Sequence, residues 1–160
     1  MTQKSQTSKT IAFFPGSFDP FTIGHWSIVK RALGMFDEII VAVGYNEAKH
    51  SLFTVEQRID MIANSLADEQ KVRVVAYVGL TVDAAKEYGA KYILRGVRMI
   101  QDFEYEKNLA EINRSLSGLE TVLLYTLPEH SHISSTTVRE LIHYKRDVTA
   151  LLPPGVNLPL

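Results

Sequence analysis

Residues 14–25 of the chain read FPGSFDPFTIGH, and they mark the change from a strand to a helix. The apolar run of residues 11–14 ends in a Pro-Gly turn, a short polar loop follows, and Thr-x-Gly-His opens a helix. A helix start presents unpaired backbone N–H groups and the positive end of the helix dipole, so it attracts phosphate. Because His25 would lie in the first helical turn, the segment indicates chemistry on a nucleotide phosphate.

Strand-like and helix-like segments alternate five times along the rest of the chain, with short connections. This alternation predicts an α/β fold, a doubly wound five-stranded parallel sheet of Rossmann-like type with helices on both faces. The predicted strands are residues 11–14, 38–43, 72–78, 92–94 and 121–125. The five predicted helices begin near His25, Thr54, Val82, Asp102 and Ser134.

Length and composition are those of one ordinary globular domain. The chain has 160 residues, 46% of them hydrophobic and 22% charged, and a net charge of −1, so nothing in the overall charge favours nucleic acid or a membrane. The absence of cysteine excludes disulfides, zinc–thiolate sites and thiol catalysis, and it fits a cytoplasmic protein. Residues 10–160 are predicted to form the single domain, and residues 1–9 a flexible polar tail.

Polar and cationic residues follow every predicted strand. In an open α/β sheet, ligands bind beyond the carboxyl ends of the strands. A nearly neutral chain with its cations at this edge suits a ligand that carries several phosphates. The residues in question are Ser17 and His25, then Asn46, Lys49 and His50, then Thr81, then Arg95, Gly96 and Arg98, and last the loop His130 to Thr137.

Each of these residues also has a simpler interpretation. His25 could be a local helix cap, Ser17 an ordinary turn residue, and Lys49 a solvated loop lysine. Arg95 and Arg98 flank a glycine and match phosphate oxygens as guanidinium forks, but Asp102 and Glu106 are obvious salt-bridge partners.

The run Ser134-Ser135-Thr136-Thr137 offers more hydroxyls than one N-cap requires, so we interpret it as a site for a pyrophosphate-like group. No Gly-x-Gly-x-x-Gly, P-loop or nucleophile elbow is present. Donors and cations without a covalent catalyst favour phosphoryl or nucleotidyl transfer by positioning and electrostatics.

Taken together, several motifs resemble those of the phosphopantetheine adenylyltransferases, members of the HxGH-type nucleotidyltransferase superfamily. The resemblance extends from about Thr10 to Pro154. The motifs are residues 15–20 (PGSFDP), 22–25 (TIGH), 95–98 (RGVR), 102–106 (DFEYE) and 133–136 (ISST), together with Lys49 shortly before residues 53–58 (FTVEQR).

The resemblance implies that ATP and 4′-phosphopantetheine react, with Mg2+, to give 3′-dephospho-coenzyme A and pyrophosphate. It implies that the enzyme assembles as a homohexamer. The resemblance assigns His25, Ser17, Lys49 and Arg95 to catalysis, with Ser17, Lys49, Thr81 and Arg95 binding the acceptor. ATP would be bound by Ser17, Phe18, His25, Gly96, Val97, Arg98, Glu106 and the loop residues His130, Ser131, His132, Ile133, Ser134, Ser135 and Thr136.

Two positions depart from the family pattern, and two other functions remain open. Ser17 stands where the family commonly has threonine, and His50 stands where it usually has a second lysine. One alternative is a related nucleotidyltransferase that acts on another phosphate, such as nicotinate mononucleotide. The other is a nucleotide-binding module without catalysis, which would have no need for the acceptor-side residues.

Overall fold

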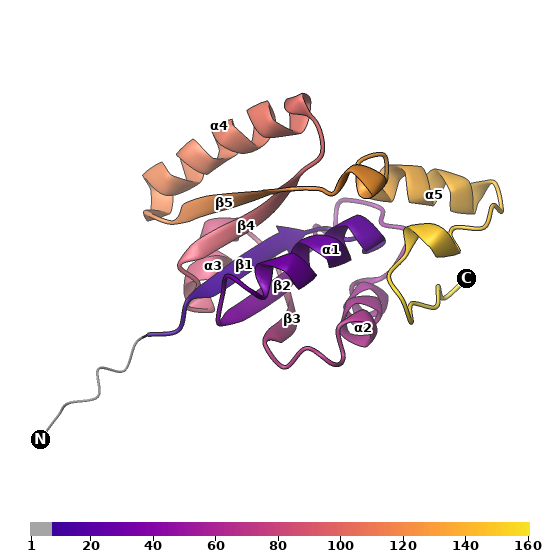
Figure 1. Cartoon of the computed structure of the whole chain (residues 1–160), viewed down its shortest axis with the longest axis horizontal. Helices are drawn as coiled ribbons and strands as arrows, with labels where there is room; N and C mark the ends of the chain where they lie inside the picture. Colours follow the sequence, from indigo (N-terminus) through magenta and orange to yellow (C-terminus); the bar gives the residue numbers. More distant parts are fainter. Residues whose placement is uncertain (1–7) are drawn as a thin grey trace, which may run out of the picture.

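The chain folds into five parallel strands with helices on both sides, as the computed structural model in Figure 1 shows. The structure describes residues 8–160, so most of the predicted tail lies outside the described residues. The strands are β1 (Ile11–Gly16), β2 (Glu38–Gly44), β3 (Val72–Tyr77), β4 (Tyr92–Val97) and β5 (Glu120–Tyr125). The helices are α1 (Ile23–Ala32), α2 (Val55–Ser65), α3 (Thr81–Glu87), α4 (Ile100–Ser117) and α5 (Ser135–His143), with short 3-10 turns at Pro128–His130 and Thr149–Leu151.

The predicted doubly wound sheet is confirmed. The strand order is β3-β2-β1-β4-β5, and every neighbouring pair is parallel. The order reverses at β1, because the chain first builds outward through β2 and β3 and then returns to the other side with β4 and β5. Ligands in such folds bind in the crevice at this reversal.

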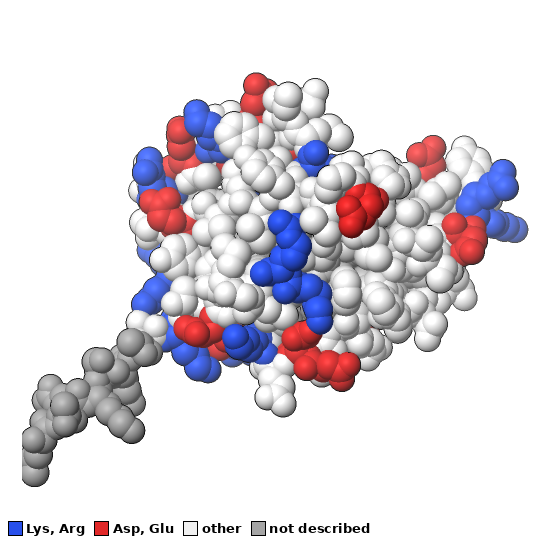
Figure 2. Space-filling view, in the orientation of Figure 1, with Lys and Arg blue, Asp and Glu red and all other residues white. Residues whose placement is uncertain are grey.

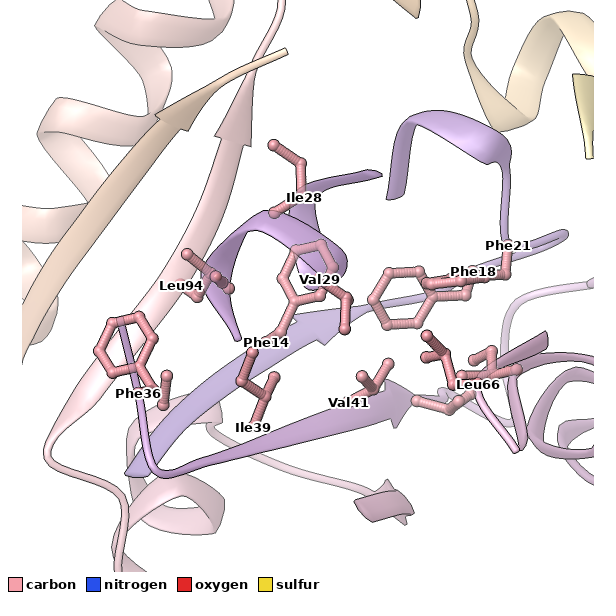
Figure 3. Close-up of a cluster of buried hydrophobic side chains, with 14 residues drawn as sticks. Phe14, Phe18, Phe21, Ile28, Val29, Phe36, Ile39, Val41, Leu66 and Leu94 are labelled. Carbon is pink, nitrogen blue, oxygen red and sulfur yellow. The ribbon is translucent and has the colours of Figure 1, made fainter. Parts of the chain in front are cut away.

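Alternating side chains of the strands build a core on each face of the sheet. Phe14 and Val41 belong to the cluster that α1 and α2 cover, and Figure 3 shows them beside Val29 and the rings of Phe18 and Phe21. The opposite face, which includes Phe13 and Ile40, packs against α3. A third cluster joins α5 to the C-terminal segment through Ile133, Val138, Val148 and Leu152.

Strands β1 and β4 pair over only two residues before they diverge. Their register contains Ala12 with Tyr92 and Phe13 with Ile93, whereas β1 pairs with β2 over its whole length. Pro15 has no N–H to donate, so β1 cannot continue this ladder. The divergence opens the sheet at the point where the strand order reverses.

Several predicted boundaries were wrong, and pairing explains the two that matter for function. We expected β1 to end at Phe14, but pairing with β2 carries it to Gly16. We expected Arg95 and Gly96 to follow the fourth strand, but both lie inside β4, paired with β5. Helix α4 begins at Ile100 rather than near Asp102. The last residues of both strands therefore form the walls of the opening.

The surface carries no large region of one charge on the face drawn in Figure 2, where basic and acidic side chains are interspersed over a mostly uncharged surface. Local clusters must therefore attract any anion. Within residues 8–160, no helix combines the length and the apolar character needed to cross a membrane.

Candidate active site

Two cavities lie side by side at the carboxyl edge of the sheet, and they share one wall. The first has a volume of about 440 Å³ and the second about 590 Å³. Both are lined by Pro15, Gly16, Ser17, Arg95, Tyr105 and Glu106. His25 and Arg95 face the same cavity, as a shared site requires. The site is therefore suited to two ligands that meet at the opening between β1 and β4.

The loop after β1 is held in an unusual conformation. Phe18 has a φ of 49°, which is a strained left-handed conformation for a bulky residue. Its buried ring folds back over Gly16, where an added Cβ would come within 2.7 Å of the ring. Only glycine fits there, and the result is a tight loop that leaves Ser17 exposed in both cavities.

His25 caps helix α1 and also faces the first cavity. The backbone N–H of Thr22 donates to His25 Nδ1 at 3.0 Å, which places the hydrogen of a neutral ring on Nε2. Burial, with a smaller effect of the charges on Arg95 and Arg98, lowers the pKa of His25 to about 3. The capping and the functional interpretations are thus compatible, because the cap uses one ring nitrogen and leaves the other as a neutral donor.

Arg95 fills the gap between β1 and β4. Its Nη1 donates to the carbonyl of Pro15 at 2.8 Å across the gap. Its Nε and Nη2 donate to the carboxylate of Glu106, with the shortest distance 2.7 Å. Glu106 is buried in α4, so it fixes the guanidinium from behind. The expected ion pair with Glu106 exists, and it orients Arg95 toward the site.

Arg98 is fixed in the same way at the mouth of the first cavity. Asp102 accepts from the Arg98 backbone N–H at 3.0 Å and from its Nε at 3.2 Å. Arg98 Nη1 donates to the carbonyl of Ile133 at 3.3 Å. The second expected ion pair is therefore present as well, and Arg98 joins the loop after β4 to the loop before α5.

Protein contacts already engage the hydroxyls at the start of α5. Ser134 Oγ caps the helix by accepting from the Thr137 N–H at 3.1 Å. Ser135 Oγ donates to the carbonyl of Pro20 at 2.8 Å, and Thr136 Oγ1 accepts from Arg139 at 3.2 Å. The first turn of α5 is thereby attached to the loop after β1, and Ser134, Ser135 and Thr136 line the first cavity.

The second cavity joins polar groups to an apolar wall. Lys49 and Thr81 line it, and the hydroxyls of Tyr77 and Thr81 are 2.9 Å apart. The tyrosine ring lies so close to Gly44 that an added Cβ there would be 3.1 Å from it. Helix α4 supplies the apolar wall through Leu109, Ala110, Ile112 and Leu116.

The structure separates the predicted site residues into two groups. Ser17, Phe18, His25, Arg95, Gly96, Arg98, Glu106, Ile133, Ser134, Ser135 and Thr136 line the first cavity, and Lys49 and Thr81 line the second with Ser17, Arg95 and Glu106. The lining of the two cavities does not include Val97, His130, Ser131 and His132. Val97 is buried. His130 ends a 3-10 turn, and its Cβ lies near Gly24.

Sequence reasoning missed several lining residues. Arg139 lines the first cavity and donates to the carbonyl of Asp19 at 2.9 Å. Its spacing of four residues from Ser135 places both on one face of α5, which is a signal that could have found it. Tyr105 lines both cavities and lies in the 102–106 motif, but no role was assigned to it; Asn113 lines the second cavity, and no motif marks it.

Comparison with known families agrees with this geometry. A family profile described as cytidylyltransferase-like matches residues 13–141, which is most of the chain. The class of the protein is therefore that of the nucleotidyltransferases, enzymes that transfer a nucleotidyl group.

Relatives with known names narrow the class. A phosphopantetheine adenylyltransferase of Phocaeicola vulgatus is 52% identical over 147 residues, covering 92% of this chain and 97% of that protein. One of Porphyromonas gingivalis is 52% identical over 150 residues, covering 94% and 98%. The chain belongs to the phosphopantetheine adenylyltransferase family.

A solved structure supports the fold alone. The crystal structure of a bifunctional NMN adenylyltransferase/ADP ribose pyrophosphatase from Francisella tularensis superposes with a TM-score of 0.72 at 16% identity. The match covers 90% of this chain and 45% of that protein.

Proposed function

We propose that this enzyme transfers the adenylyl group of ATP to 4′-phosphopantetheine, giving 3′-dephospho-coenzyme A and pyrophosphate, a step of coenzyme A synthesis. The observation that carries the proposal is the pair of cavities that share Ser17 and Arg95. A direct transfer between two substrates requires such a common wall, where the attacking oxygen of one meets the phosphorus of the other.

ATP occupies the first cavity in this proposal. The first turns of α1 and α5 offer backbone N–H groups to its phosphates, and Arg98 and Arg139 add positive charge. An added Cβ on Gly24 would meet no protein atom closer than 3.5 Å, so packing does not require this glycine. Close approach of a phosphate to the backbone is a reason for a glycine at this position.

The acceptor occupies the second cavity. Lys49 and Arg95 bind its phosphate, while its pantetheine arm extends along α4 toward Thr81 and the apolar wall. A cavity of about 590 Å³ is large enough for an elongated small molecule. The polar end and the apolar wall of this cavity match an acceptor with a phosphate at one end.

The reaction is a single displacement. A phosphate oxygen of 4′-phosphopantetheine attacks the α-phosphorus of ATP, that P–O bond forms, and the bond from the α-phosphorus to the bridging oxygen of pyrophosphate breaks. Ser17 and Arg95 hold the attacking phosphate, and neutral His25 donates from Nε2 to an α-phosphoryl oxygen, where negative charge increases. No proton has to leave the enzyme, because the acceptor oxygen is already an anion.

Mg2+ enters in this proposal as a part of the ATP substrate. Among residues 8–160, no three acidic or histidine side chains are grouped as a metal site. The two carboxylates nearest the cavities, Asp102 and Glu106, are engaged by arginines. These residues fit a metal that the ATP phosphates carry rather than a resident one, and the metal would reduce the charge of those phosphates.

Assembly into a homohexamer in the cytoplasm completes the proposal. At the start of α4, Met99, Ile100 and Phe103 are 50%, 76% and 41% exposed, and none of them lines either cavity. Apolar side chains this exposed on one part of a surface favour an interface between subunits. The mass of the purified enzyme in solution, measured by light scattering, tests the expected number of six subunits.

A pyrophosphate-release assay tests the function. With ATP and Mg2+, we expect release in the presence of 4′-phosphopantetheine and none in its absence or with nicotinate mononucleotide. Release with nicotinate mononucleotide alone would favour the related nucleotidyltransferase. Binding of ATP without release under any acceptor would favour a module without catalysis.

A further inference from the structure

Three charged side chains are buried in the part of the chain that the structure describes: Asp19, Arg58 and Glu106. Glu106 holds Arg95 by the ion pair described above. Of the other two, Asp19 belongs to the loop after β1 and Arg58 to α2, and the mechanism uses neither of them. Burial of a charge is costly unless hydrogen bonds satisfy it, so their contacts show what they hold in place.

Asp19 binds the segment between β2 and α2. Its Oδ2 accepts from the backbone N–H of Leu52 at 2.8 Å, and its Oδ1 accepts from that of Phe53 at 2.9 Å. This segment also carries Lys49, three residues before Leu52. A carboxylate from the first loop therefore fixes one end of the second loop, close to the lysine that faces the acceptor cavity.

Arg58 makes the reciprocal contact. It lies in α2, is 2% exposed, and donates from Nη1 to the carbonyl of Ser17 at 2.7 Å. Its Nε donates to the carbonyl of Thr54 at 3.3 Å. Burial lowers the pKa of Arg58, and the negative charge of Asp19 opposes that shift. The two segments are thus joined twice, with a buried acceptor from one and a buried donor from the other.

The strained residue of the site lies between these two attachments. Phe18, with its φ of 49°, separates Ser17, whose carbonyl Arg58 holds, from Asp19. A strained backbone persists only where its surroundings fix it. The ring of Phe18 also packs edge-on against His25, with 5.1 Å between the ring centroids.

We propose that Asp19 and Arg58 are positioning residues that hold Ser17 and Lys49 at a fixed spacing across the acceptor cavity. They touch neither substrate and act through the two loops. The proposal rests on the function proposed above, in which Ser17 and Lys49 bind the acceptor phosphate. It predicts that the two loops lose their mutual alignment when either buried charge is replaced, and that acceptor binding, which uses both loops, is weakened more than ATP binding, which uses only the first.

A double-mutant cycle with Asp19→Asn and Lys49→Ala tests the proposal in the full-length enzyme. We expect Asp19→Asn to raise KM for 4′-phosphopantetheine about 10-fold and to change KM for ATP less than about 2-fold. Lys49→Ala should then raise KM for 4′-phosphopantetheine about 10-fold in the wild-type background. In the Asp19→Asn background it should raise that KM less than about 3-fold, because Lys49 is already misplaced. Additive effects would overturn the proposal.

Asp37→Asn is the matched control. Asp37 likewise accepts from a backbone N–H, that of Thr10 at 2.8 Å, but at the amino end of β1. The Asp37→Asn substitution should leave both KM values unchanged, and its effect should add to that of Lys49→Ala. Arg58→Met should act as Asp19→Asn does, and Arg58→Lys, which keeps the charge but not the fork, should restore part of the lost acceptor affinity.

Limited trypsin digestion separates failure of this proposal from failure of the proposed function. Cleavage after Lys49, followed by mass spectrometry, needs no activity. We expect it to be about 10-fold faster in Asp19→Asn than in the wild type or in Asp37→Asn, at a temperature where all three are folded. If the wild type lacks the proposed activity, equal cleavage rates overturn the positioning role and faster cleavage supports it.

Discussion

The two cavities are built in different ways, although they share a wall. Contiguous motifs at the starts of α1 and α5 and at the end of β4 line most of the first cavity. The second is lined mainly by side chains on one side of α4 and by residues 77–82 at and after the end of β3, together with single residues such as Lys49 and Thr121. The phosphates of a nucleotide can be bound by backbone N–H groups at helix starts, whereas the acceptor must be recognised by individual side chains. Substitutions should therefore separate the two cavities by substrate.

The largest expected effect belongs to His25, which faces the first cavity only. His25→Ala removes the neutral Nε2 donor, so turnover should fall about 10²–10³-fold, while the Kd for ATP changes little. Single-turnover kinetics and ATP titration measure the two quantities separately. A variant with normal turnover would remove His25 from the mechanism.

The pH dependence supplies an independent test of the same residue. A pKa of about 3 keeps His25 neutral in the free enzyme, so the donor is already in its active form at every pH above that value. Between pH 8 and pH 5 we expect kcat/KM of the wild type and of a His25→Gln variant to change with pH in the same way. A decrease that occurs only in the wild type is not expected. Such a decrease would mean that the ring is protonated in this range and that Nδ1 does not accept from Thr22.

Arg95 lies in the shared wall, so its loss should affect both substrates. Arg95→Gln should lower kcat/KM for ATP and for 4′-phosphopantetheine about 50-fold each, because one guanidinium faces both cavities. It would also leave Glu106 buried without its partner and destabilise the fold. The double variant with Glu106→Gln should recover thermal stability but not activity. Recovery of activity with stability would show a purely structural role.

The fold and the first cavity could largely be predicted from the sequence, since both depend on local patterns. The alternation of strands and helices predicts the sheet, and Thr22-x-Gly24-His25 predicts a helix start with an imidazole in its first turn. The end of β4 was placed wrongly because the run of apolar residues stops at Leu94, whereas pairing with β5 continues to Val97. Sheet pairing is not a local property, so no periodicity along the chain could show it.

The second cavity was less predictable for the same reason. The sequence singled out Lys49 and Thr81, but not the wall of α4, because an apolar face on a helix predicts burial in a core as readily as a ligand. The buried contacts of Asp19 with residues 52–53 span more than 30 positions. Only the folded chain brings these groups together.

A crossed pair of substitutions should separate the two cavities most directly. Lys49 lines only the second cavity and Arg98 only the first. Lys49→Ala should raise KM for 4′-phosphopantetheine about 10-fold and leave that for ATP unchanged, and Arg98→Ala should do the reverse. Equal effects of either substitution on both substrates would mean that the two cavities are not the two substrate sites.

The smallest expected effect belongs to His50, which follows Lys49 in the exposed loop of the second cavity. His50→Lys adds a permanent positive charge beside the cavity proposed for the acceptor, so KM for 4′-phosphopantetheine should fall about 2–3-fold at low ionic strength. KM for ATP should stay constant, because the first cavity does not include this loop. The gain should shrink as salt is added, since an exposed charge is readily screened. A salt-independent gain would mean that the new side chain at position 50 contacts the substrate directly. A change in KM for ATP would contradict the separation of the two cavities.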